Sequence, residues 1–139
     1  MDDAISTSQP PRVLIIEDEQ GILDILTVNL EASGCEVIGA ADGLAGWRAF
    51  ERERPDLVIL DINLPKISGF RLLELFRDSP PPHTPVLALT ALDFAEAEEL
   101  AHLGLDAFIS KPFQPEEVVC AVFQLLGRGA EGGRHVDGT

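Results

Sequence analysis

A run of four apolar residues, 57–60, ends at the carboxylate Asp61, and this junction constrains the fold more than any other stretch. The turn-favouring residues Asn63, Pro65 and Gly69 follow it. A short continuous apolar run that is bounded by turn signals predicts a strand buried on both faces, as in a parallel sheet. Ligands bind at the carboxyl ends of the strands in open α/β sheets. Asp61 is therefore predicted to stand at the functional edge of such a sheet.

Similar apolar runs recur along the chain and alternate with segments of helical periodicity. The strands are predicted at residues 12–16, 35–40, 57–60, 85–89 and 107–109. The helices are predicted at residues 20–33, 42–54, 68–77, 93–104 and 115–126. Five strand–helix repeats predict a doubly wound α/β fold, with a parallel sheet covered by helices on both faces. Periodicity leaves the order of the strands open.

The same spacing assigns side chains to the interior. Asp42 and Asp93 are predicted to cap the second and fourth helices, and both cysteines are expected to be buried free thiols. The predicted inward-facing helix residues are Ile22, Ile25, Leu26, Leu30, Trp47, Phe50, Leu72, Leu73, Phe76, Ala97, Leu100, Ala101, Val118, Val122 and Leu125.

Length and charge limit the domain organisation and the partners. The 139 residues suit one compact domain, predicted over residues 12–126. Residues 1–11 are expected to form a disordered leader without secretory features, and residues 127–139 a flexible tail or linker. No apolar run is long enough to span a bilayer, so a cytoplasmic location without membrane contact is expected. The net charge of −14 argues against direct nucleic-acid binding by this chain.

Polar side chains stand where four of the predicted strands end. Because parallel strands share one carboxyl edge, these residues are expected to converge. Carboxylate oxygens suit Mg²⁺, and an ammonium and a hydroxyl can hold phosphoryl oxygens. At this point two roles remain open for the carboxylate of the third strand, metal ligand or nucleophile that accepts a phosphoryl group. The converging residues are Glu17, Asp18, Glu19, Asp61, Thr90 and Lys111.

Five segments at these strand ends resemble a known family. They are VLIIEDE at 13–19, PDLVILDINLP at 55–65, SGF at 68–70, VLALTA at 86–91 and FISKPF at 108–113. Over residues 12–126 the chain is similar to the receiver domain of two-component response regulators, including chemotaxis-regulator-like single domains and isolated receivers. The resemblance implies a flavodoxin-like five-stranded sheet of order 2-1-3-4-5 with five helices. It also implies that Asp61 accepts a phosphoryl group from a sensor histidine kinase or phosphotransfer protein.

The resemblance assigns Mg²⁺ to the acidic residues. Asp18, Asp61 and the backbone carbonyl of Asn63 would bind the ion directly, and Glu17 would act mainly through water. Glu17 departs from the family, which usually has aspartate there. Its side chain is one methylene longer, so metal binding should survive with an altered affinity.

The resemblance also implies how the phosphoryl group is held and detected. Thr90 and Lys111 would bind it, and Phe108 matches the aromatic switch that turns inward when Thr90 is drawn to the phosphate. A cis peptide bond is implied before Pro112. The family more often has tyrosine at the switch, so Phe108 offers no hydroxyl to a partner. Leu92, two residues beyond Thr90, is expected to affect the access of hydrolytic water.

The implied function is phosphorelay signal transduction, in which phosphorylation changes a protein-binding or dimerisation face. The partners would be the phosphoryl donor and either a downstream effector or a second copy, and the chain would be a phosphoacceptor rather than an enzyme. A haloacid-dehalogenase-type phosphatase is an alternative, but its nucleophile ends the first strand and a second aspartate follows two residues later. Here Asp61 ends the third strand and Asn63 follows. A receiver-shaped module that never takes phosphate is disfavoured by intact Asp61, Thr90 and Lys111.

Overall fold

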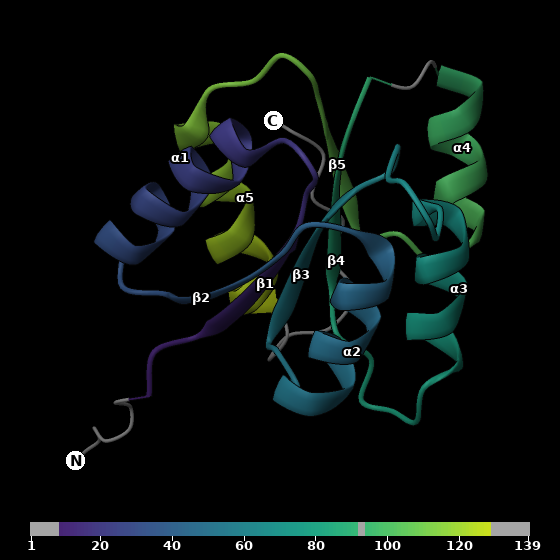
Figure 1. Ribbon diagram of the computed structural model, residues 1–139, viewed down its shortest axis with the longest axis horizontal. Helices are drawn as coiled ribbons and strands as arrows, with labels where there is room; N and C mark the ends of the chain where they lie inside the picture. Colours follow the sequence, from purple (N-terminus) through teal and green to yellow (C-terminus); the bar gives the residue numbers. More distant parts are fainter. Residues whose placement is uncertain (1–8, 92–93, 129–139) are drawn as a thin grey trace.

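One parallel sheet forms the centre of the molecule (Figure 1). The computed structural model describes residues 9–91 and 94–128. The strands lie in the order β2-β1-β3-β4-β5, which confirms the flavodoxin-like order that the family resemblance implies. Their bounds are β1 Arg12–Ile16, β2 Glu36–Ala40, β3 Leu57–Asp61, β4 Val86–Thr90 and β5 Ala107–Ser110.

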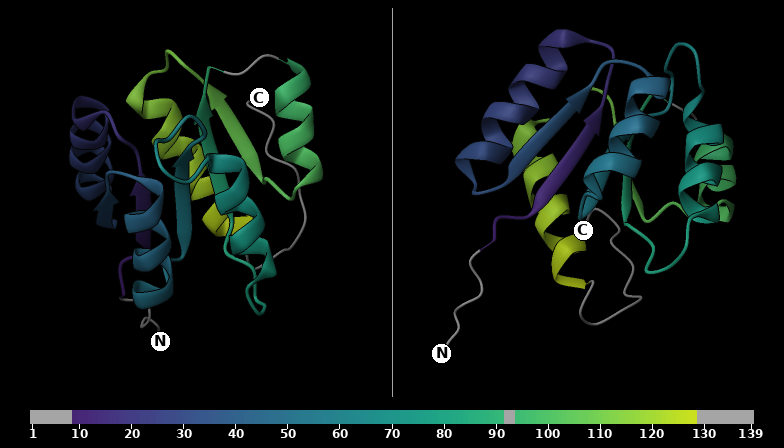
Figure 2. Two further views of the ribbon diagram at one scale, coloured as in Figure 1. Left: turned by 45° about the vertical axis from the view of Figure 1, so that its right-hand side comes forward. Right: turned by 60° about the horizontal axis from the view of Figure 1, so that its bottom comes forward.

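Helices cover both faces of the sheet, so the molecule has three layers (Figures 1 and 2). One face is covered by α1 (Gln20–Ala32) and α5 (Pro115–Arg128). The other is covered by α2 (Gly43–Glu53), α3 (Gly69–Asp78) and α4 (Phe94–His102). This arrangement is the doubly wound fold that the strand–helix alternation predicts.

The apolar runs form strands because each needs two buried faces. Along β1, Val13 and Ile15 join the core beneath α1 and α5, and Leu14 and Ile16 join the core beneath α2 and α3. All four side chains are fully buried, as are residues 57–60 of β3. Alternation of side chains across a strand therefore supplies both hydrophobic cores from one continuous apolar run.

Local caps fix where the helices begin and end. The Asp42 carboxylate accepts the Ala45 N–H, which confirms this residue as the N-cap of α2. Ser68 caps α3 in the same way through the Arg71 N–H, so α3 begins at Gly69, one residue later than expected. The predicted cap at Asp93 and the side chain of Ala97 lie outside what the structure describes, as do residues 1–8 of the predicted leader (1–11) and residues 129–139 of the predicted tail (127–139).

Three of the expected burials are wrong. Ile25 is 47% exposed, and Ala101 and Cys120 are also exposed. Successive residues in an α-helix are about 100° apart, so Ile25 lies well to one side of the inward stripe centred on Leu26. Ala101 is displaced from the buried Leu100 in the same way, and Cys120 lies on the outer side of α5. Cys35 is buried, as expected.

Trp47 is half-buried rather than fully enclosed, within an aromatic cluster on α2 and α3. Its ring stacks on Phe50 at a centroid distance of 5.7 Å and on Phe76 at 6.0 Å. The Phe50 and Phe76 rings are 4.4 Å apart. Among the described residues, no helix has the length and apolar character needed to cross a membrane.

Arg77 joins three segments at the amino-terminal edge of the sheet. Its guanidinium donates to the Gly104 carbonyl at 2.7 and 3.0 Å and to the Thr84 carbonyl at 2.9 Å. It also pairs with Asp106 at 2.6 Å, and the same carboxylate oxygen accepts the Val86 N–H. The Arg77 side chain is only 17% exposed. Little water can therefore reach these acceptors and take the place of the guanidinium as a hydrogen-bond donor.

We expect Arg77→Ala to lower the free energy of unfolding by about 2–4 kcal/mol, because it leaves partly buried acceptors unpaired. Arg71→Ala is the matched control on the same helix, since among the described residues the Arg71 guanidinium pairs with exposed Glu74 alone. The control should change stability by no more than about 0.5 kcal/mol. Urea unfolding of both variants tests this, and equal effects would contradict the role given to Arg77.

Candidate functional site

Strand register brings the predicted site residues to one edge of the sheet. Glu17 follows β1 and donates its N–H to the Ala40 carbonyl at the end of β2. The Lys111 N–H donates to the Thr90 carbonyl at 2.8 Å, which ties the ends of β4 and β5 together. Asp61 is the last residue of β3, between these two pairs. The sheet thus collects residues that are up to 94 positions apart, from 17 to 111.

Three carboxylates cluster at this edge. One oxygen from each of Glu17, Asp18 and Asp61 lies within 4.8 Å of the others. Glu17 is 1% exposed and Asp61 is 3% exposed, whereas Asp18 is open to solvent. Two buried carboxylates so close together repel each other strongly unless a cation compensates.

Lys111 supplies positive charge inside the cluster. Its ammonium nitrogen is 3.5 Å from Asp61 Oδ2 and 3.5 Å from Glu17 Oε1. It is also 4.0 Å from Glu19 Oε1, a contact that the sequence did not predict although Glu19 was placed at this strand end. One ammonium therefore serves three carboxylates, which leaves the cluster negatively charged.

Glu17 has an incomplete set of partners. Its Oε2 atom accepts the Glu19 N–H at 3.1 Å. Its Oε1 atom is buried and has no hydrogen-bond partner among the described residues, since the Lys111 contact at 3.5 Å has the distance of an ion pair without hydrogen-bond geometry. A buried polar atom without a partner is uncommon and costly, so this oxygen is suited to a ligand.

Burial is the main reason that the pKa of Glu17 is raised to about 7, and repulsion by Asp61 adds to it. The Glu19 N–H and the Lys111 ammonium oppose this increase without cancelling it. With no metal ion bound, Glu17 therefore keeps its proton to a higher pH than an ordinary glutamate does.

The loop after Asp61 is held close to the acids. Asp61 Oδ1 accepts the Asn63 N–H at 3.0 Å, which turns the chain directly after the strand. The Gly69 N–H donates to the Ile62 carbonyl, and a Cβ atom on Gly69 would lie 2.6 Å from the Ile62 Cα. A side chain at Gly69 would therefore displace the loop that carries Asn63.

The remaining predicted residues lie on β4 and β5. Thr90 is buried at the end of β4, beside the Lys111 backbone. Phe108 is 44% exposed, so its ring faces outward in this structure. The peptide bond between Lys111 and Pro112 is cis, as the family resemblance implies. Leu92 lies outside the described residues.

A family model named "Response regulator receiver domain" matches residues 13–123. The chain belongs to this family. Receiver domains are the phosphoacceptors of two-component signal transduction and act between histidine kinases and effectors. No enzyme family is indicated by the comparisons.

Curated relatives agree with this assignment. The chain is 40% identical over 120 residues to the DNA-binding dual master transcriptional regulator RpaA of Synechocystis, covering 85% of this chain and 50% of RpaA. It is 39% identical over 118 residues to the alkaline phosphatase synthesis transcriptional regulatory protein PhoP of Bacillus subtilis, covering 84% and 49%. The receiver chain thus spans about half the length of these relatives.

Solved receiver structures share the fold. A CheY-like response regulator receiver domain from Methanospirillum hungatei has a TM-score of 0.83 and 29% identity, covering 90% of this chain and all of that one. The chemotaxis response regulator CheY4 of Vibrio cholerae has a TM-score of 0.76 and 30% identity, covering 85% and 99%. These matches confirm the predicted family and the predicted general role in two-component signal transduction.

The raised pKa of Glu17 gives a test of the charge cluster. A carboxyl that binds its proton more tightly in the folded state stabilises the protein below its unfolded pKa, and this contribution is lost as the pH rises through 7. Glu17→Gln removes the ionisation. In metal-free buffer at pH 8 we expect the variant to be more stable than the unmodified chain by about 2–3 kcal/mol.

The difference in unfolding free energy between Glu17→Gln and the unmodified chain should shrink towards pH 5, where the native Glu17 is protonated. Denaturant unfolding at both pH values, with a chelator present, measures it. Glu31→Gln, an exposed change on α1, is the control and should be neutral at both. A variant that is less stable at pH 8 would contradict the repulsion described above.

Proposed function

We propose that this chain accepts a phosphoryl group on Asp61 and thereby switches a protein-binding or dimerisation face. The observation that supports the proposal best is the position of the Lys111 ammonium, 3.5 Å from the buried Asp61 carboxylate. A phosphoryl group on Asp61 would bring negative charge directly beside this cation. Phosphoryl transfer depends mainly on positioning and charge neutralisation, and both are available at this site.

The acidic cluster fits Mg²⁺ as the cofactor. The unpartnered oxygen of Glu17 and the closely spaced oxygens of Asp18 and Asp61 form a hard oxygen donor set, which Mg²⁺ prefers. Asp18, Asp61 and the Asn63 carbonyl would hold the ion, and Glu17 would contribute mainly through water. When bound, Mg²⁺ would neutralise charge on the carboxylates and on the phosphoryl oxygens.

The transfer itself forms one bond and breaks one. An oxygen of the Asp61 carboxylate attacks the phosphorus of a phosphohistidine on a sensor histidine kinase or phosphotransfer protein, forming a P–O bond. The P–N bond breaks, and the donor imidazole keeps the electron pair and takes up a proton. Lys111 and the Thr90 hydroxyl hold the phosphoryl oxygens. The product is an aspartyl phosphate, and the chain is a phosphoacceptor rather than a turnover enzyme.

The switch would run from Thr90 to Phe108. When Thr90 is drawn to the phosphoryl group, space opens beside β4, and the exposed Phe108 ring on β5 turns into it. The surface around β5 then changes shape for a downstream effector or for a second copy of the chain. Light scattering with the acyl-phosphate mimic beryllofluoride separates these partners, since only self-association raises the mass of the isolated chain.

Binding of beryllofluoride in Mg²⁺ tests the proposed phosphoacceptor directly. Calorimetry should show saturable binding to the unmodified chain that disappears with a chelator and in Asp61→Asn. Asp78→Asn, an exposed change on α3, is the matched control and should bind normally. Retained binding in Asp61→Asn would refute the assignment, and steady hydrolysis of phosphomonoesters would refute the non-enzymatic role.

Weakening the metal site should separate the proposed Mg²⁺ binding from the proposed phosphorylation of Asp61. Asp18→Asn removes one proposed Mg²⁺ ligand and leaves Asp61 intact. We expect the Mg²⁺ concentration needed for half-maximal stabilisation to rise about tenfold, in the range typical for lost metal-site interactions. Thermal melting across a Mg²⁺ series measures this shift, and an unchanged midpoint would remove Asp18 from the ligand set.

A further inference from the structure

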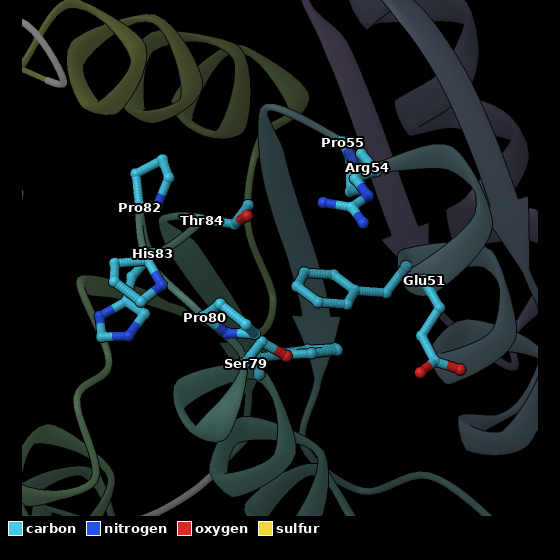
Figure 3. Close-up of a pocket in the computed structure, with 11 residues that line it drawn as sticks. Glu51, Arg54, Pro55, Ser79, Pro80, Pro82, His83 and Thr84 are labelled. Atoms are coloured by element: carbon cyan, nitrogen blue, oxygen red, sulfur yellow. The ribbon is translucent and has the colours of Figure 1, made fainter.

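A pocket of about 440 Å³ lies at the opposite edge of the sheet from the acids (Figure 3). Pro55 precedes β3 and Thr84 precedes β4, so the pocket is at the amino-terminal ends of these strands. Its volume falls within the range of small-molecule sites. The lining residues are Phe50, Glu51, Arg54, Pro55, Phe76, Ser79, Pro80, Pro81, Pro82, His83 and Thr84.

Six of the eleven lining residues have stiff aromatic or proline rings, and the other five are polar or charged. Phe50 and Phe76 contribute aromatic rings that are already packed on each other and on Trp47. Proline rings from the loop after α3 form the facing wall (Figure 3). Side chains held this way lose little conformational freedom when a ligand enters, which favours binding of a flat or branched apolar group.

Arg54 is the one arginine among the polar and charged lining residues, and its backbone is unusual. It is the C-cap of α2 and has φ of 50°, a left-handed conformation that glycine adopts far more easily. Its guanidinium forms no ion pair among the described residues. Glu51, which also lines the pocket, turns its carboxylate away from Arg54 (Figure 3). Arg54 is therefore a solvent-exposed cation with no ion-pair partner among the described residues, in a backbone conformation that glycine adopts more easily.

We propose that this pocket binds a small organic carboxylate with an aromatic or branched aliphatic body. The apolar body would pack against Phe50, Phe76 and the proline wall. The carboxylate would pair with the Arg54 guanidinium, which forms no ion pair with Glu51 or with any other described residue. This site differs from the proposed phosphoryl site because it lies at the other end of the strands, is lined partly by aromatic and proline rings, and needs no metal.

Phenylacetate and its neutral analogue phenylacetamide test the proposal, because they share one body and differ in charge. Trp47 is the only tryptophan and stacks on Phe50, so its indole N–H resonance and its fluorescence report on the pocket wall. A ligand of this size should bind with a Kd on the order of 1 mM. The amide should bind about three- to fivefold more weakly, as expected for one solvent-accessible ion pair.

Arg54→Gly separates the ligand role from a folding role. Glycine suits the left-handed position, so the melting temperature should stay the same or rise, while the preference for phenylacetate over the amide should disappear. Arg48→Ala removes the same charge from an exposed position of α2 and should preserve the preference. Absence of binding by both probes at about 20 mM, well above the expected Kd, would overturn the proposal. An undiminished preference in Arg54→Gly would also overturn it.

Discussion

The contact between Lys111 and the buried carboxylates of Glu17 and Asp61 is the interaction on which the rest of this structure depends. It exists only because β1, β3 and β5 run parallel and end at one edge, so side chains from distant positions meet. The ammonium offsets part of the repulsion between the acids. The remaining negative charge and the unpartnered Glu17 oxygen would give the proposed site its affinity for a cation and, through the cation, for a phosphoryl group.

The rest of the fold supports this site through close packing. The three inner strands β1, β3 and β4 are buried on both faces, and Gly69 packs too closely on Ile62 to tolerate a side chain. A charged cluster that destabilises the metal-free protein can persist because these well-packed layers stabilise the fold. The acidic cluster and the Arg54 pocket lie at opposite ends of the same strands, so the sheet separates the proposed Mg²⁺ and phosphoryl site from the proposed carboxylate site.

Much of the fold and site could be predicted from the sequence, because both follow from where apolar runs stop. The stop at Asp61 marks a strand end, and parallel topology then brings Thr90 and Lys111 to the same edge. The order of the strands required the family resemblance. Features that depend on three-dimensional packing could not be predicted. The hydrogen bonds of Arg77 and the left-handed Arg54 beside a pocket have no signal in periodicity. The exposed position of Cys120 does have one, because two residues beyond Val118 is the opposite side of α5.

Locating the phosphoryl group on the chain tests the central claim most directly. The chain would be incubated with acetyl phosphate and Mg²⁺, and the acyl phosphate reduced with borohydride, which converts a phosphorylated aspartate to homoserine. Tandem mass spectrometry then identifies the modified residue. The account predicts homoserine at Asp61 alone, and none when a chelator is present. Modification at Asp18, or an unmodified chain under conditions that phosphorylate another receiver, would contradict it.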